Sequence, residues 1–208
     1  MGVTARDWSE QYLTADDLER TMVAAALRCV ARWGFAKTTF DDIAREAGVS
    51  RATAYRVFPG GKDRLVATVL HHEIGRLFHE AETEVAATDS LEDLLCTGIR
   101  LAMQMLTGHE VLQYMLQHEP EVVLPHFAFH RLDVVLAYAA ELSSPHLARF
   151  LPEPAVRPAA ELVARVVLTF SFNPSDRVDP NDPLSIRRLV QTYLLPAITP
   201  NAELRSPR

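Results

Sequence analysis

The chain has 208 residues, with 21 lysines and arginines against 27 aspartates and glutamates, so its net charge at pH 7 is 21 − 27 = −6. Hydrophobic residues make up 48% and charged residues 23%, which is close to the average for soluble globular proteins and excludes collagen-like, coiled-coil and disordered chains. The length allows one large domain or two small ones. The negative net charge argues at first against a nucleic-acid-binding protein, because phosphate binding requires lysine and arginine.

Cysteine content and hydropathy predict the compartment. The two cysteines, Cys29 and Cys96, are too few for a disulfide framework or a zinc site, and we expect free thiols in a reducing cytosol. The first thirty residues contain no basic segment followed by an apolar run, so we expect no signal peptide. No stretch approaches ~18 consecutive apolar residues, the length that spans a membrane. The sequence therefore predicts a cytoplasmic protein without a membrane partner.

The first half of the chain has the pattern of long helices. Residues 1–13 show no helical period, and we expect a flexible arm there. Apolar residues then recur every three or four positions from Met22 to Trp33, which places one apolar face on a helix that ends at Gly34. The Pro59-Gly60-Gly61 sequence indicates a turn. The helices expected in this half span about 14–34, 39–47, 50–58 and 62–86.

Proline breaks the second half into shorter helices. Twelve of the 13 prolines lie between Pro120 and Pro207, and proline interrupts helical hydrogen bonding. Sustained apolar–polar alternation is absent, so strands are not expected. The sequence predicts an all-α protein of nine or ten helices, with a flexible tail at 201–208. The helices expected here span about 90–105, a segment ending near 118, 131–143, 155–172 and 183–198, with a broken segment at 120–130.

Residues 39–58 have the spacing of a helix-turn-helix. Ala44 is small enough for two helices to cross closely, and Gly48 tolerates the positive φ that the turn requires. The positions that must be buried are all apolar: Ile43, Ala47, Val49, Ala54 and Val57. The outward positions of the second helix carry side chains that suit base edges and phosphates: Ser50, Arg51, Ala52, Thr53 and Arg56. The alternative is an αα-corner that does not bind DNA.

Charge is concentrated on this motif. Between Arg28 and Arg64 there are eight basic and four acidic residues, or 8 − 4 = +4. Both lysines of the chain, Lys37 and Lys62, lie in this patch. Residues 71–208 contain 11 basic and 18 acidic residues, or 11 − 18 = −7. A local basic patch is expected where a protein contacts phosphates, so it favours DNA binding over the αα-corner.

The run 34–58 resembles the DNA-binding domain of the TetR family of bacterial transcriptional repressors, and the likeness covers about residues 18–70. It rests on the Gly-Phe that follows the first helix, the paired Thr38-Thr39, the Ile-Ala…Ala-Gly-Val-Ser core, and Tyr-x-x-Phe followed by a lysine. The turn before Lys62 is one residue longer than is usual in the family, which leaves the role of that lysine open. Val57 stands where the family often has an aromatic residue or histidine.

The resemblance implies an N-terminal three-helix DNA-binding domain at 14–61 and a helical ligand-binding and dimerisation domain at 62–200. It also implies a homodimer, which we expect to pair through its last two long helices and to bind a pseudo-palindromic double-stranded operator. Thr38 and Thr39 would hold phosphate at a helix N-terminus. The full set of candidate DNA-binding residues is Lys37, Thr38, Thr39, Ser50, Arg51, Ala52, Thr53, Tyr55, Arg56 and Lys62.

A ligand cavity in the C-terminal domain is expected from the resemblance. Apolar residues crowd 99–135, where methionines among aromatics would make an adaptable lining, although plain helical core explains any one of these residues better. The segment 116–125 resembles a stretch in a subgroup of these regulators, some of which govern fatty-acid or lipid metabolism, which suggests an apolar, acyl-like effector. The candidate ligand-binding residues are Met103, Gln104, Tyr114, Met115, His118, Phe127, His130 and Phe170.

The sequence offers no motif for a metal, a cofactor or catalysis. His126 and His130 are spaced to share an ion, but only Asp133 lies near enough to add a ligand, so no metal is expected. Ser/His/Asp order, a phosphate-binding loop and HExxH are absent. We therefore expect a ligand-responsive repressor and not an enzyme. The alternatives are a helical small-molecule carrier or enzyme whose helix-turn-helix is only structural, and a DNA-binding protein without an effector.

Overall fold

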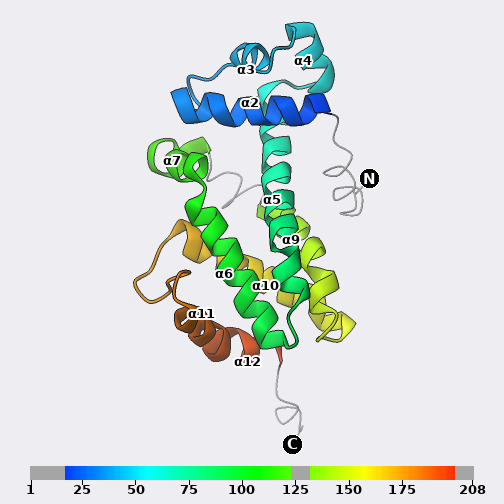
Figure 1. Ribbon diagram of the computed structural model, residues 1–208, viewed down its shortest axis with the longest axis vertical. Coiled ribbons are helices and arrows are strands. Elements are labelled where there is room, and N and C mark those ends of the chain that lie inside the picture. Colours follow the sequence, from blue (N-terminus) through cyan, green and yellow to red (C-terminus); the bar gives the residue numbers. More distant parts are fainter. Residues whose placement is uncertain (1–16, 123–131, 200–208) are drawn as a thin grey trace, which may run out of the picture. The chain divides into compact units, whose positions relative to one another are not determined.

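The computed structural model describes residues 17–122 and 132–199, and in these ranges the regular structure is helical apart from one isolated bridge between Ser175 and Val178 (Figure 1). The predicted all-α fold is confirmed. Within the same ranges, none of the helices combines the length and apolar character needed to cross a membrane. The helices are α2 (Asp17–Trp33), α3 (Phe40–Glu46), α4 (Arg51–Val57), α5 (Lys62–Ala86), α6 (Leu91–Gly108), α7 (Glu110–His118), α9 (Leu132–Leu147), α10 (Glu153–Phe172), α11 (Pro183–Leu189), the π-helical segment η1 (Val190–Leu194) and α12 (Leu195–Ile198).

The described residues form two compact units. Unit 1 contains residues 17–79 together with 109–122, and unit 2 contains residues 80–108 together with 132–199. Helix α5 contributes residues to both units, and α7 belongs to the unit that contains the helix-turn-helix. The expected arm and tail, 1–13 and 201–208, lie outside the described residues, and the domain boundaries at 14–61 and 62–200 stay predictions.

The core of unit 1 is formed by α2, α3, α4 and the start of α5. Met22 and Ala25 of α2 are fully buried, as their helical spacing predicts. The helix dipole of α2 interacts favourably with Asp17 and Glu19 in the first turn and with Arg32 in the last turn. In Figure 1, α3 and α4 lie on one side of α2 and α7 lies on the other.

The helix-turn-helix has the geometry that its spacing predicts. Gly48 has φ +72°, and the amide of Val49 donates to the carbonyl of Ala44 over 2.9 Å, which closes the turn. Ile43, Ala44 and Ala54 are buried. The other positions expected to be inward, Ala47, Val49 and Val57, are partly buried and pack against the same core.

The core of unit 2 is formed by α6, α9, α10 and the C-terminal helices. Ile99 and Val190 are fully buried there. Helix α9 continues to Leu147 and contains Pro145, whereas the sequence predicts an end near Ser143. The helix continues although Pro145 has no N–H donor and its ring crowds the carbonyl four residues before it. The next bonds are kept, since the amide of Ala148 donates to the carbonyl of Ser144 over 2.9 Å and Leu147 is anchored in the core.

The last predicted helix, 183–198, contains a local irregularity. The segment Val190–Leu194 is π-helical and comes shortly before Pro196, which lies at the start of α12. A proline ring clashes with the carbonyl four residues before it in a regular α-helix, and a wider turn relieves such a clash. The chain therefore stays helical through Ile198 despite the proline.

Both cysteines are free, as predicted. Burial raises the pKa of the Cys29 thiol, and burial likewise raises the pKa of the Cys96 thiol. The reactive form of cysteine is the thiolate. These two residues therefore behave as apolar packing groups of α2 and α6.

Candidate nucleic-acid interface

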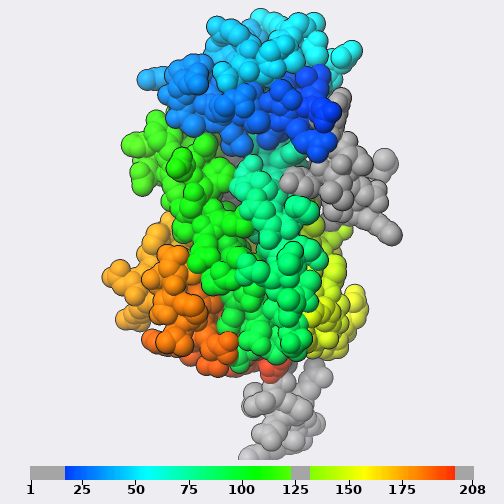
Figure 2. All heavy atoms as spheres, viewed as in Figure 1, coloured from blue at the N-terminus to red at the C-terminus, as the bar shows by residue number. Residues whose placement is uncertain are grey.

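Helix α4 presents four exposed residues on its outward side. Arg51, Ala52, Tyr55 and Arg56 are exposed, while Ala54 faces the core. On the face shown in Figure 2, the atoms of α4 (cyan) lie at the surface of unit 1. These exposed positions are four of those that the sequence predicts to face DNA.

The start of α4 is fixed by a cap. Ser50 has extended backbone, and its hydroxyl oxygen accepts from the amide of Thr53 over 3.1 Å. The two hydroxyl groups of Ser50 and Thr53 also lie 2.9 Å apart. Both candidate residues are therefore engaged in capping α4, which gives the first turn of the helix a defined geometry.

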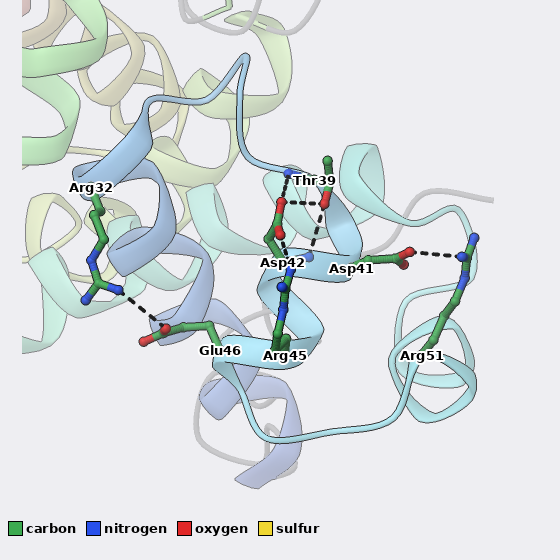
Figure 3. Close-up of polar contacts among 7 residues, drawn as sticks. All are labelled: Arg32, Thr39, Asp41, Asp42, Arg45, Glu46 and Arg51. Carbon is green, nitrogen blue, oxygen red and sulfur yellow. Dashed lines mark hydrogen bonds and ion pairs between the residues drawn. The ribbon is translucent and has the colours of Figure 1, made fainter.

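Arg51 is held by a neighbour on α3. One of its guanidinium nitrogens lies 2.9 Å from a carboxylate oxygen of Asp41, which is an ion pair between the two helices of the motif (Figure 3). The guanidinium also lies 5.5 Å from the ring centroid of Tyr55. Because both partners of the ion pair are largely exposed, it contributes little to stability. It orients a side chain that would otherwise move freely.

Two cationic candidates have no such neighbour. Among the described residues, neither the guanidinium of Arg56 nor the ammonium of Lys37 has a hydrogen-bond or ion-pair partner, and both residues are exposed. Other arginines of the patch are paired with the acidic residues of α3. Arg28 contacts Glu46, and Figure 3 shows the contacts of Arg32 with Glu46 and of Arg45 with Asp42. Arg56 is thus the arginine of α4 that is available to a ligand without breaking an ion pair.

The start of α3 is a capping box. The Thr39 hydroxyl accepts from the amide of Asp42 over 3.1 Å and donates to the Asp42 carboxylate over 2.5 Å, and that carboxylate also accepts from the Thr39 amide over 3.0 Å (Figure 3). The hydroxyl of Thr39 is the main cause that lowers the pKa of Asp42, and its amide adds to the effect. The exposed Thr39 side chain is therefore held in one orientation at the end of the helix.

Thr38 differs from its neighbour. Its side chain is only 1% exposed, and its hydroxyl donates to the carbonyl of Gly34 over 2.6 Å. Its amide donates to the carbonyl of Phe35 over 3.2 Å. Both groups that the resemblance assigns to phosphate binding are thus engaged inside the turn 34–38, and the phosphate role of Thr38 stays a prediction.

Lys62 is directed at the same turn. Its ammonium donates to the carbonyl of Phe35 over 2.6 Å and lies 3.7 Å from the centroid of the Phe35 ring. Burial lowers its pKa, although nearby carboxylates oppose this. The extra residue before it is accommodated by Gly60 and Gly61, which have φ +114° and +64°. A phosphate contact would require Lys62 to leave Phe35, so that role also stays a prediction.

Sequence reasoning missed the importance of Glu119. Its carboxylate accepts from the amide of Phe35 over 2.5 Å and from the amide of Ala36 over 2.9 Å. These partners are more than eighty positions away in the chain, so no local spacing indicates the contact. The nearest signal is Gly34, whose φ of +81° turns the two amides toward one point.

The ligand-binding candidates divide between the units. Met103, Gln104 and Phe170 lie in unit 2, and Tyr114, Met115 and His118 lie on α7 in unit 1. Phe127 and His130 lie outside the described residues, as does His126 of the histidine pair considered for a metal. Among the residues that the structure describes, no three of the types His, Cys, Asp and Glu are grouped to hold a metal ion.

The described candidates differ in their surroundings. Met103 is 1% exposed and belongs to the core of unit 2, where Phe170 packs beside it as a partly buried side chain. Gln104 donates to the carbonyl of Pro180 over 3.0 Å. The ring of Tyr114 is exposed and lies 4.6 Å from the ring of His118. Met103 and Phe170 thus serve as packing residues, and a ligand role for any of the set stays a prediction.

Residues 22–69 match the family profile described as bacterial regulatory proteins, tetR family. The HTH-type transcriptional regulator BetI of Brucella anthropi is 34% identical over 71 residues, which covers 34% of this chain and 36% of that protein. BetI of Brucella canis is 42% identical over 60 residues, which covers 27% of this chain and 30% of that protein. The chain thus spans about a third of the length of the curated relatives that it matches.

Solved structures share the fold over most of the chain. The TetR family repressor AlkX of Dietzia sp., implicated in biodegradation of n-alkanes, has a TM-score of 0.67 at 21% identity and covers 84% of this chain and 96% of its own. The fatty acid degradation regulator FadR of Bacillus halodurans has a TM-score of 0.57 at 19% identity and covers 84% of this chain and 95% of its own. At these identities the likeness shows the fold.

Replacing Thr39 with Val should raise the pKa of Asp42 toward its ordinary value, because the hydroxyl that donates to the carboxylate is removed. A pKa lowered by folding means that the carboxylate stabilises the folded state above its unfolded pKa. This stabilisation is lost as the pH falls through the folded pKa. The wild-type protein should therefore tolerate acid to a lower pH than the variant.

An NMR titration of the Asp42 side chain measures this shift. Thr53→Val is the matched control, because that hydroxyl contacts Ser50 and not Asp42. If Asp42 titrates identically in the Thr39 variant and in the wild type, the capping box does not hold the carboxylate as the geometry indicates.

Proposed function

The chain belongs to the TetR family of bacterial regulatory proteins, and from this we propose that it is a transcriptional repressor. In this proposal α4 enters the major groove of double-stranded operator DNA, and a small apolar effector releases the protein from it. The observation that carries the proposal is the capped helix-turn-helix, in which α4 exposes an arginine, Arg56, that has no partner among the described residues.

We infer the roles within the interface from which side chains have a partner within the protein and which do not. Arg56 suits guanine, since a guanidinium can donate two hydrogen bonds to its major-groove edge. Ala52 suits the methyl group of thymine by apolar contact, and Tyr55 brings a hydroxyl to the same surface. Lys37 suits phosphates, which fix position without reading sequence. Thr39 would have to exchange the Asp42 carboxylate for phosphate. Arg51 would have to exchange Asp41 for DNA.

We propose that the protein is a homodimer that pairs through its C-terminal helices. Leu184 of α11 and Tyr193 of η1 are each 69% exposed, whereas Ile186 and Val190 on the same run face the core of their own unit. These two large side chains lie in solvent on the C-terminal helices, where a partner subunit would cover them. A two-fold axis at this surface would present two copies of α4 to half-sites ~34–36 Å apart or a multiple of it, hence to a pseudo-palindrome.

An apolar, acyl-like effector is the ligand that we propose. FadR of Bacillus halodurans is a regulator of fatty acid degradation, and AlkX of Dietzia sp. is a repressor implicated in n-alkane biodegradation. Fatty acids and n-alkanes are both molecules with apolar chains. An effector acts only if it binds one conformation of the protein better than the other, and that difference in affinity sets how far it shifts operator binding.

Replacing Arg56 with Ala should weaken binding to the DNA upstream of the protein's own gene by about 10- to 100-fold, because a bidentate base contact discriminates by ~1–3 kcal/mol. Gel shifts at low and moderate salt measure the affinity. Arg177→Ala is the matched control, since it removes the same charge from an exposed position of unit 2 that lies between α10 and α11, outside the helices proposed to pair.

Equal weakening by the Arg177 variant would mean that net charge, and not α4, governs the binding. Wild-type protein that fails to shift this DNA even at low salt would contradict the proposal and favour the carrier or enzyme alternative.

Replacing Tyr193 with Asp should convert the dimer to monomers, because a carboxylate would be buried against an apolar surface without a partner. Analytical ultracentrifugation across a concentration series gives the oligomeric state. Val134→Asp on α9 is the control, since Val134 is also an exposed apolar residue but lies outside the proposed interface. A Tyr193 variant that sediments as wild type places the interface elsewhere.

Long fatty acids should raise the melting temperature of the protein, because a ligand that binds only the folded state stabilises it by mass action. Thermal shifts are measured for decanoate and palmitate, with acetate as the short-chain control. An unchanged melting temperature with every chain length would reject an acyl effector and support a DNA-binding protein without one.

A further inference from the structure

The turn 34–38 binds an anion that belongs to the protein itself. After Gly34, with φ +81°, the successive amides of Phe35 and Ala36 point at one carboxylate, that of Glu119, at 2.5 and 2.9 Å. Successive backbone N–H groups that follow a left-handed residue form a concave anion site. Hydrogen bonds to an ionised acceptor are stronger than neutral ones, so this carboxylate holds the turn firmly.

The peptide group between Phe35 and Ala36 is also held on its carbonyl side, by a cation. The Phe35 carbonyl accepts from the ammonium of Lys62 over 2.6 Å and from the amide of Thr38 over 3.2 Å. Phe35 is therefore fixed between a negative group that binds its N–H and a positive group that binds its C=O. The two charges come from the region after α7 and from the start of α5.

Helix α7 is itself anchored at both ends within unit 1. At its N-terminus, His109 caps the helix by accepting from the amide of Leu112 over 3.2 Å, and its other ring nitrogen lies 3.0 Å from the carboxylate of Glu73 on α5. At its C-terminus, the amide of Glu119 donates to the carbonyl of Met115 over 2.8 Å. Glu119 thus extends from a fixed helix end and is not a freely moving surface carboxylate.

The turn that Glu119 holds leads directly into the proposed DNA contacts. Lys37 lies within it, and Thr39, the N-cap of α3, follows it immediately. If the carboxylate leaves, two amides lose their acceptor and the turn gains conformational freedom. DNA binding must then order the turn again, which lowers affinity. A displacement of α7 would act on the interface through the same contact.

We propose that Glu119 is a positioning residue for operator binding: its carboxylate, bound to the amides of Phe35 and Ala36, holds the turn 34–38 in the conformation that presents Lys37 to phosphate. This rests on the proposed function, since it assumes that α3 and α4 bind DNA. It gives residues 109–122 a direct mechanical connection to the interface, because these residues and the turn lie in one unit.

Glu119→Gln tests the proposal, with Glu121→Gln as the matched control. Glu121 is exposed, lies two positions away and has no hydrogen-bond or ion-pair partner among the described residues, so both variants remove the same charge. The Glu119 variant should bind operator DNA about tenfold more weakly, which corresponds to ~1.4 kcal/mol, while the control should match the wild type. Hydrogen exchange should speed up at the amides of Phe35 and Ala36 in the Glu119 variant only.

Gly34→Ala perturbs the same contact from the other side. A Cβ at Gly34 would meet a carboxylate oxygen of Glu119 at 3.0 Å, whereas a Cβ at Gly48, which also has positive φ, would meet no atom within 4 Å. Both substitutions carry the strain of a left-handed alanine. Gly34→Ala should therefore lower the melting temperature more than Gly48→Ala does, and this difference should shrink when Glu119 is replaced by Ala.

The outcomes separate the two proposals. Wild-type protein that binds no DNA overturns the proposed function and, with it, the positioning role. Wild-type protein that binds DNA, together with a Glu119 variant that binds as well as the Glu121 control, overturns the positioning role alone. Should Glu119→Gln fail to fold, Glu119→Asp takes its place. It keeps the charge but is one methylene shorter, and the same order of affinities and exchange rates is expected.

Discussion

The close crossing of α3 and α4 is the constraint on which the rest of unit 1 depends. Two short helices can cross closely only if the residues between them are small and the turn accepts a positive φ. Ala44, Ala54 and Gly48 satisfy these conditions. Each helix has only seven residues, which is too short to be stable in isolation. Packing against α2 and side-chain caps therefore supply the stability, and the caps leave the outward face of α4 for other contacts.

Charge in this unit is arranged to orient side chains as well as to attract phosphate. The acidic residues of α3 pair with arginines on three helices, so half of the eight basic residues between Arg28 and Arg64 already have a carboxylate partner. An arginine that must first break an ion pair gains less free energy on binding DNA than an arginine without a partner. Arg56, which has no partner among the described residues, is thus the strongest candidate for reading a base, and Arg51 bound to Asp41 is a weaker one.

Local patterns predicted most of the fold and much of the candidate interface. The helical period of residues 22–33 and the glycine at position 48 depend only on neighbours in the chain, and the structure places both as expected. Helix ends near proline were less predictable. Pro145 lies inside α9, because the lost hydrogen bond is compensated by packing of Leu147 in a core that is assembled from distant segments.

The sequence by itself determined the all-α architecture, the helix-turn-helix and the outward set on α4, because each depends on spacing along one or two helices. Tertiary structure alone decided which of the candidate DNA-binding side chains already have a partner within the protein. The engagement of Thr38 and Lys62 with the turn 34–38 and the contact of Glu119 with Phe35 join segments that no local period relates. Only folding brings a carboxylate to amides more than eighty positions away, and the strength of such a contact depends on burial and geometry that the order of residues does not record.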